Sequence, residues 1–213
     1  MKMLTRVLAC IAILTIACGT LLAADAHPER AITVGSGIVH PGHIEAKLKT
    51  IYTNLGSSTD AYYSANGWLV AGSSSALGHI QWIGMSFSPT KKATATEIQI
   101  ALLYDNSGTN AAEVVLAADS SGLPGKTLAS WDVKNLPTFG TCCKLITVKS
   151  KKGVKLAAKT QYWVIGQTDS KSDTSYDTWN YTYNETTGGF AYNVGSGWLA
   201  YDSDLSAYGV FGK

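Results

Sequence analysis

Short runs of alternating apolar and polar residues recur along the chain, separated by turn-forming residues. Residues 96–104 show the pattern most clearly, because Ile98, Ile100 and Leu102 would share one side of an extended strand. The other runs occupy residues 61–71, 79–87, 113–118, 127–133, 145–148, 161–166, 176–183, 190–194, 198–201 and 207–211. About ten short strands at this spacing predict an all-β fold, a jelly-roll-like β-sandwich of two antiparallel sheets. No long helical period competes with it.

Composition agrees with one compact, β-rich domain. The chain has 213 residues, of which 46% are hydrophobic and 15% charged, and its formal net charge is +2. The low charged fraction excludes a disordered chain, and the near-neutral balance argues against a nucleic-acid partner, which would require a strongly basic face. We assign residues 59–213 to the β-sandwich domain and the irregular residues 27–58 to an N-terminal extension or linker.

The N-terminus has the pattern of a secretory signal peptide over residues 1–26. Lys2 and Arg6 form its positive start, residues 7–16 form its apolar run, and residues 24–26 (Ala-Asp-Ala) supply the cleavage site. We therefore expect an exported protein, extracellular or in the cell envelope or periplasm. The mature chain would have no transmembrane segment.

Two other interpretations of this segment remain open. Residues 4–24 are nearly long enough to span a bilayer as an uncleaved anchor. Residues 15–18 (Thr-Ile-Ala-Cys) look like a bacterial lipoprotein box, which would place a lipid on Cys18. We favour simple export over both.

The cysteines limit the possible disulfides to one. Of the four cysteines, Cys10 and Cys18 leave with the predicted signal peptide, so only the adjacent Cys142 and Cys143 remain. An oxidising compartment favours a bridge between them, although neighbouring Cα atoms lie closer than an ordinary disulfide prefers. The alternative is two reduced thiols that point to opposite faces of a strand. A metal site is disfavoured because no CxxC spacing and no nearby histidine accompany the pair.

A lysine-rich segment lies between two of the predicted strands. We expect residues 145–148 to pair with residues 161–166 across this segment as a turn. Six lysines fall between Lys144 and Lys159. They would either grip an anionic polymer or a lipid surface, or serve as solvated turn and edge residues that oppose aggregation. Without neighbouring arginines we favour the second interpretation.

Two segments resemble the signatures of a known family. Residues 119–128 (DSSGLPGKTL) match the pattern D-x-x-G-x-P-G-x-x-L. Residues 156–164 (LAAKTQYWV) are similar to L-x-A-G-T-x-Y-W-V, with Lys159 in the place of the usual glycine. Both patterns are those of secreted bacterial proteins with a choice-of-anchor R type domain.

The resemblance extends over roughly residues 60–213, because residues 82–89 (WIGMSFSP) and 208–212 fit the family as well. It implies an exported β-sandwich of undetermined role, with no catalytic residues to carry over. Independently of the family, Pro124 fixes φ and Gly125 permits a positive φ in a tight connection.

The C-terminal third concentrates aromatic residues that alternate with polar ones. Trp179, Tyr181 and Tyr183 would share one face of a strand, and Trp198 and Tyr201 follow a glycine-rich turn that returns beside it. Exposed aromatic rows flanked by Asn, Asp and Thr suit sugar rings, because their C–H faces stack on aromatics while hydroxyls bond polar groups. The alternative is that these rings fill the core. All five are candidate ligand-binding residues.

Signatures of catalysis and of metal binding are sparse. The chain has no G-x-S-x-G elbow, H-E-x-x-H helix or phosphate-cradling loop, and its four histidines all lie between His27 and His79. Oxygen-rich segments at residues 105–110 and 169–177 would suit Ca²⁺, but Asx-turns explain them better. We therefore expect no cofactor, no metal and no enzymatic activity.

The sequence predicts a secreted, non-catalytic β-sandwich module that binds a glycan or another cell-surface partner. The aromatic strands and the Cys142–Cys143 segment would form its binding site. One alternative is a structural or self-associating envelope protein. Another is a carbohydrate-active hydrolase, since a fold can bring two distant carboxylates together.

Overall fold

The computed structural model describes residues 30–32, 48–56, 60–184 and 186–213. Within these ranges all regular secondary structure is β-strand, so the expected all-β fold is confirmed. The predicted signal peptide, residues 1–26, lies outside the described residues. The strands are β1 (Arg30–Ile32), β2 (Lys49–Thr53), β3 (Asn66–Ala71), β4 (Trp82–Phe87), β5 (Ala93–Ile100), β6 (Leu102–Ser107), β7 (Ala111–Ser120), β8 (Leu123–Lys134), β9 (Ile146–Leu156), β10 (Tyr162–Gln167), β11 (Tyr176–Asn180), β12 (Thr187–Asn193), β13 (Trp198–Asp204) and β14 (Tyr208–Gly212).

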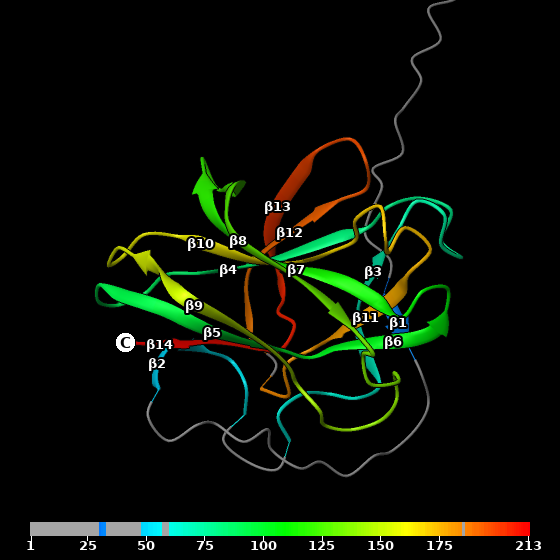
Figure 1. Ribbon diagram of the computed structural model, residues 1–213, viewed down its shortest axis with the longest axis horizontal. Helices are drawn as coiled ribbons and strands as arrows, with labels where there is room; N and C mark the ends of the chain where they lie inside the picture. The colour runs from blue at the N-terminus through cyan, green and yellow to red at the C-terminus, as the bar shows by residue number, and fades with distance from the viewer. Residues whose placement is uncertain (1–29, 33–47, 57–59, 185) are drawn as a thin grey trace, which may run out of the picture.

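The strands form three antiparallel sheets. One has six strands in the order β13-β12-β4-β10-β7-β8, and two have four, in the orders β1-β3-β11-β6 and β2-β14-β5-β9. Figure 1 shows the six-stranded sheet in the upper half of the molecule, with β2-β14-β5-β9 at the lower left and β1-β3-β11-β6 at the right.

The two four-stranded sheets join into one layer at Ala101, the single residue between β5 and β6. The Asn180 amide donates to the Ala101 carbonyl (2.9 Å), and the Ala207 amide donates to the Asn180 carbonyl (2.8 Å). The Ala101 amide in turn donates to the Ala207 carbonyl (3.1 Å). The predicted strand 96–104 is therefore two strands in two sheets, because the chain changes sheets at Ala101.

Aromatic rings from this joined layer pack against rings of the six-stranded sheet. The centroids of Trp68 (β3) and Phe190 (β12) are 4.5 Å apart, and those of Phe87 (β4) and Tyr208 (β14) are 6.5 Å apart. The Tyr208 hydroxyl also donates to the Ser86 carbonyl across the interface (2.8 Å). Large rings that interdigitate between two layers are the core of a β-sandwich, which confirms the predicted architecture.

The lysine-rich segment is a strand, and its pairing differs from the predicted one. β9 pairs with β5, while β10 lies between β4 and β7 in the other layer. The predicted pairing of residues 145–148 with residues 161–166 is therefore wrong. β9 is the edge of its sheet, and the exposed lysines Lys149, Lys151, Lys152 and Lys155 oppose pairing with another chain.

Part of the predicted N-terminal extension is built into the sandwich. β2 pairs with β14, and the following residue, Asn54, is buried. Its side-chain amide donates to the Ser206 carbonyl (2.8 Å), and its side-chain oxygen accepts from the Tyr208 amide (2.7 Å). Asn54 thus fixes the end of β2 against the segment that leads into β14.

The β7–β8 connection is tighter than its sequence pattern predicts. The residues with positive φ are Ser121 (56°) and Gly122 (84°), as a two-residue hairpin turn of type I′ requires, and Gly125 is not among them. Gly125 is required for a different reason, because a Cβ there would lie 2.7 Å from the Ser120 Cβ. The expectation of a positive φ at Gly125 is thus wrong.

Asp119 connects this turn to the neighbouring strand β10. Its carboxylate accepts hydrogen bonds from the Gly122 amide (3.0 Å), the Trp163 indole (2.9 Å) and the Gln161 side chain (2.8 Å). Burial would raise the pKa of Asp119, but these bonds outweigh it and hold the pKa below its usual value. The segments 119–128 and 156–164 therefore contact each other through one carboxylate.

Lys159 is held in a left-handed backbone conformation. Its φ is 54°, and its amide donates to the Pro89 carbonyl (2.7 Å), which fixes the turn before β10. Glycine adopts this conformation without the steric cost that a Cβ imposes.

We expect Lys159→Gly to stabilise the fold by roughly 0.5–1 kcal/mol, because relief of the left-handed strain exceeds the added chain entropy of glycine. Chemical denaturation measures the change. Lys155→Gly is the matched control: Lys155 lies within β9, where glycine should destabilise by roughly the same amount. A loss of stability in Lys159→Gly would contradict this account of the turn.

Asp177 places a carboxyl group inside the sandwich. Its side chain is fully buried on β11, and neither carboxyl oxygen has a hydrogen-bond partner in the described part of the chain. Burial, together with the nearby charge of Asp105, raises the pKa of Asp177 to about 9. The folded protein therefore keeps this carboxyl protonated at neutral pH, while the unfolded chain loses the proton above about pH 4.

Because the folded pKa is raised, Asp177 lowers stability as pH rises from about 4 towards 9. We expect Asp177→Asn to match the wild type in free energy of unfolding near pH 4 and to exceed it by roughly 2–4 kcal/mol at pH 7. Denaturation curves at several pH values test this. The exposed Asp202→Asn serves as control and should change stability by less than about 0.5 kcal/mol throughout. A pH-independent difference for Asp177→Asn would refute the assignment.

Candidate functional site

A pocket of about 600 Å³ opens where β3 begins and where β11 and β13 end. Three tyrosines and several small polar side chains form its wall. The lining residues are Tyr63, Asn66, Tyr181, Thr182, Tyr183, Thr186, Asp204 and Leu205. The volume falls within the range of about 300–1,000 Å³ typical of small-molecule sites.

The tyrosines offer both exposed and buried ring surface. Tyr63 and Tyr183 are 45% and 51% exposed, and their ring centroids lie 6.1 Å apart at a tilt of 43°. Tyr181 is half-buried and packs edge-on against Trp68 at 5.7 Å. A ligand that enters the pocket therefore meets two exposed rings, Tyr63 and Tyr183, while the third, Tyr181, packs against the core.

Backbone hydrogen bonds hold these tyrosines in place. The Tyr63 amide donates to the Tyr181 carbonyl (2.9 Å), and the Tyr63 carbonyl accepts from the Asn180 side-chain amide (2.8 Å). The Tyr181 amide donates to the Asn66 carbonyl (2.9 Å), and the Thr182 hydroxyl to a backbone carbonyl of the segment after β2. The pocket wall is thus attached to the ends of strands, which are rigid supports for a binding site.

The polar side of the pocket consists of amide, hydroxyl and carboxylate groups. Asn66 and Thr186 can donate and accept hydrogen bonds, and Asp204 can accept them, whereas the buried Thr182 hydroxyl is already bonded within the protein. The Trp68 indole donates to the Asp204 carbonyl (3.0 Å), which fixes the end of β13 against the core. Among the described lining residues Asp204 is the only acidic one, and none is basic.

The structure brings two of the five predicted aromatics to this pocket, Tyr181 and Tyr183. Trp179 is not available to a ligand: it is fully buried, and its indole donates to the Ala207 carbonyl (3.0 Å). The interpretation of Trp179 as a member of an exposed platform is wrong. Its face of β11 points into the sandwich, where Trp179 packs on Tyr208 with ring centroids 5.9 Å apart.

Trp198 and Tyr201 lie on β13, apart from the pocket lining. Trp198 packs against a second apolar cluster on the outer face of the six-stranded sheet, which contains Val115, Ala117, Trp163, Ile165 and Ala191. Tyr201 is 41% exposed and packs against Phe190 with ring centroids 5.2 Å apart. Alternation along a strand shows which side chains share a face. It does not show whether that face lies in the core or in solvent, and the five aromatics therefore lie in different environments.

Two residues of the pocket, Tyr63 and Asp204, were not among the predicted ligand-binding residues. Tyr63 was placed inside a predicted strand over residues 61–71, but β3 begins only at Asn66, so Tyr63 belongs to the turn before it. The adjacent residues Tyr62 and Tyr63 could have indicated an exposed ring. Neighbouring side chains in an extended chain point to opposite faces, so two adjacent large rings cannot both face one core. In the structure Tyr62 is buried and Tyr63 is exposed.

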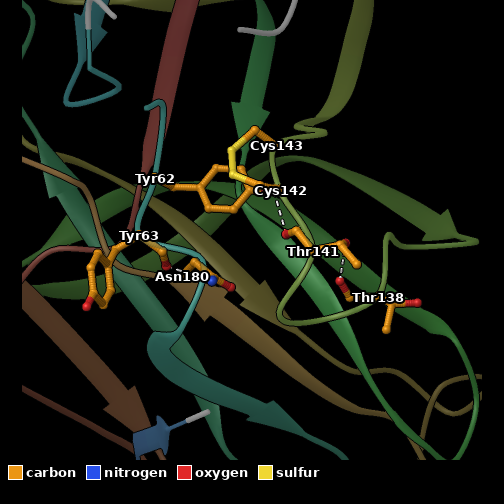
Figure 2. Close-up of a disulfide and its surroundings, with 7 residues drawn as sticks. All are labelled: Tyr62, Tyr63, Thr138, Thr141, Cys142, Cys143 and Asn180. Carbon is orange, nitrogen blue, oxygen red and sulfur yellow. Dashed lines mark hydrogen bonds between the residues drawn. A yellow bond between two sulfur atoms is a disulfide. The ribbon is translucent and has the colours of Figure 1, made fainter. Parts of the chain in front are cut away.

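Cys142 and Cys143 form a disulfide, which decides between the two interpretations left open by the sequence. Figure 2 shows the Tyr62 ring beside this disulfide, while the Tyr63 ring points in another direction. The loop before it runs along β6: the Tyr104 amide donates to the Pro137 carbonyl (2.8 Å), and the Phe139 amide donates to the Tyr104 carbonyl (2.7 Å).

This disulfide loop shares an apolar cluster with the sheet β1-β3-β11-β6. Leu69 and Leu103 of this sheet are both buried. They belong to the same apolar cluster as Tyr62, Phe139 and Cys143. The disulfide loop is therefore packed into the apolar core of the protein.

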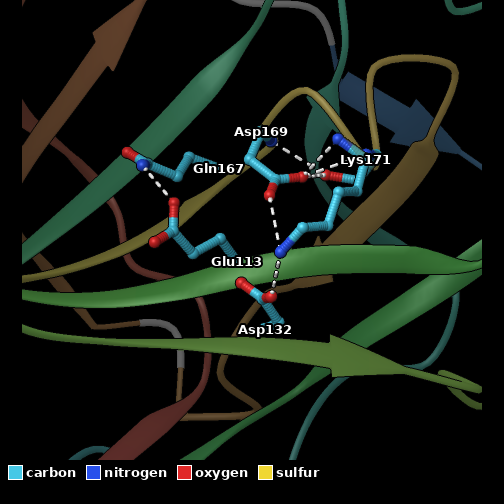
Figure 3. Close-up of polar contacts among 6 residues, drawn as sticks. Glu113, Asp132, Gln167, Asp169 and Lys171 are labelled. Atoms are coloured by element: carbon cyan, nitrogen blue, oxygen red, sulfur yellow. Dashed lines mark hydrogen bonds and ion pairs between the residues drawn. The ribbon is translucent and has the colours of Figure 1, made fainter.

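One of the acidic segments begins with the predicted Asx-turn, at Asp169, whereas Asp105 lies on β6 and Asp177 on β11. The Asp169 carboxylate accepts from the Lys171 amide (2.9 Å) and from the Ser172 amide (3.0 Å), which is an Asx-turn. Figure 3 shows the Lys171 ammonium between Asp132 (2.9 Å) and Asp169 (4.0 Å). A side-chain cation thus occupies the space between these carboxylates, and no group of three or more metal-ligating residues occurs in the described ranges.

No family model matches the sequence, and neither a curated protein nor a solved structure matches the chain. Function is therefore inferred from the chemistry of the pocket itself. Its wall combines exposed tyrosine faces with hydroxyl, amide and carboxylate groups that form hydrogen bonds. Such a wall suits a ligand with apolar ring faces and many hydroxyls.

Proposed function

We propose that this protein is an exported, non-catalytic β-sandwich module that binds a neutral glycan or a similar cell-surface polymer. The single observation that carries the proposal is the pocket at the ends of β11 and β13, which faces solvent with the rings of Tyr63 and Tyr183. Sugar rings present apolar C–H faces that stack on such rings, while their hydroxyls reach the polar groups beside them.

The charges around the pocket favour a neutral ligand. Asp204 is the acidic member of the described lining, and no lysine or arginine among the described residues joins it there. An anionic polymer would meet the carboxylate of Asp204, which opposes binding by like-charge repulsion and desolvation. Neutral hydroxyls, in contrast, can donate to Asp204 and exchange hydrogen bonds with Asn66 and Thr186.

The same lining favours binding over hydrolysis. Glycoside hydrolysis ordinarily requires two carboxyl groups on either side of the scissile bond. The described lining supplies one, at Asp204. The buried Asp177 does not add a second, because it points into the sandwich core and lies outside the pocket lining.

Export is the cellular setting that fits the proposal. The disulfide between Cys142 and Cys143 suits an oxidising compartment outside the cytoplasm. No helix among the described residues is long and apolar enough to cross a membrane. The resemblance to secreted bacterial choice-of-anchor R domains supports the same setting.

Binding to a panel of neutral oligosaccharides, including gluco-, xylo-, manno- and chito-oligomers, tests the proposal by calorimetry. We expect Tyr183→Ala and Tyr63→Ala each to weaken binding by roughly tenfold or more, because each removes a stacking ring from the pocket. Tyr201→Ala is the matched control: it removes a tyrosine of similar exposure outside the pocket and should leave affinity within about twofold.

All three variants alter partly exposed rings, so thermal unfolding should show that they remain folded. Failure of the wild type to bind any member of the panel would contradict the proposal. Equal losses in Tyr183→Ala and Tyr201→Ala would contradict the assignment of the site.

A further inference from the structure

Tyr62 contacts the disulfide loop. Its hydroxyl donates to the carbonyl of Thr141 (3.4 Å), the residue that directly precedes the Cys142–Cys143 pair. Tyr62 and Cys143 are both buried in the same apolar cluster. Burial raises the pKa of Tyr62 well above its ordinary value, so the hydroxyl stays protonated and can donate at any physiological pH.

The next residue, Tyr63, belongs to the pocket. Its amide and its carbonyl are bonded to Tyr181 and to the Asn180 side chain, so Tyr63 and Tyr181 are fixed to each other. Figure 2 shows the adjacent residues Tyr62 and Tyr63: the Tyr62 ring lies against the disulfide, and the Tyr63 backbone meets Asn180. One peptide unit therefore connects the disulfide loop to the pocket wall.

We propose that the Cys142–Cys143 disulfide is a redox gate for this pocket. The oxidised pair fixes the Thr141–Lys144 loop, which holds Tyr62 and, through it, Tyr63 in the ligand-binding position. Reduction frees the loop, and the ring of Tyr63 loses its fixed place beside Tyr183. This inference rests on the proposed function of the pocket as a glycan site.

The reducing agent would be a dithiol, which supplies two electrons and two protons. Its thiolate attacks the sulfur of Cys142, forming a mixed disulfide and releasing Cys143 as a thiolate that takes up a proton. The second thiol then closes the dithiol to its own cyclic disulfide and frees Cys142. Cys142 is half-buried and follows the exposed Thr141, whereas Cys143 is buried. The attacking thiolate can therefore reach the sulfur of Cys142 more easily than that of Cys143.

The reduced cysteines no longer need to lie together. Adjacent side chains in an extended chain point to opposite faces, whereas the disulfide holds both sulfurs on one side. Cys143 packs in the apolar cluster with Tyr62, so separation of the sulfurs disturbs the contact that fixes this ring.

The test compares the full chain before and after treatment with dithiothreitol, and mass spectrometry of the alkylated peptide verifies reduction at residues 142 and 143. We expect reduction to weaken binding of the oligosaccharide panel by roughly tenfold. Hydrogen exchange supplies a readout that needs no ligand. The Tyr63 amide, which donates to Tyr181, should exchange about tenfold faster in the reduced protein.

Two variants separate the gate from other effects of the reductant. The double variant Cys142→Ser with Cys143→Ser should bind as weakly as the reduced wild type and should not respond to dithiothreitol. Tyr62→Phe keeps the disulfide but removes the hydroxyl that bonds to the Thr141 carbonyl, so its affinity should depend less on reduction.

Unchanged exchange at Tyr63 on reduction would overturn the gate, whether or not any oligosaccharide binds. Absence of binding to the oxidised protein would instead overturn the proposed function, and the exchange data would still decide on the gate. Loss of the β-sheet circular dichroism signal on reduction would also overturn the redox gate, because the disulfide would then hold the whole fold together.

Discussion

Asn180 is the position on which the rest of the structure depends. Its backbone amide and carbonyl join the two four-stranded sheets by bonding to Ala101 and Ala207, which makes one layer out of two. Its buried side chain donates to the Tyr63 carbonyl. Because the backbone and the side chain of this one residue bond to both segments, the junction of the sheets and the placement of the pocket wall both depend on Asn180.

The position of the pocket follows from this junction. β11 ends at Asn180, and the next three residues, Tyr181 to Tyr183, leave the sheet and line the pocket. Inside the sandwich the same strand carries Trp179, whose indole bonds the Ala207 carbonyl. β11 is thus part of the core, while the chain that follows it lines the pocket and exposes Tyr183 there, so that a rigid core supports the rim of the pocket.

Local patterns predicted the strands well because period-two alternation is a property of neighbouring residues. Ile98 and Ile100 face the core as expected. The sequence could not show that the chain changes sheets at Ala101, or that β9 pairs with β5, since both depend on hydrogen bonds to distant segments. The site was half predicted for the same reason. Tyr181 and Tyr183 lie in one aromatic run, whereas Tyr63 and Asp204 join them only through the fold.

The most direct test of the account is to locate a bound ligand by amide chemical shifts while the neutral oligosaccharide panel is titrated into the oxidised protein. The account predicts that the largest shifts cluster at Tyr63, Asn66, Tyr183 and Asp204, around the pocket. Shifts centred instead on the exposed Leu199 of β13, or none at saturating oligosaccharide, would contradict it.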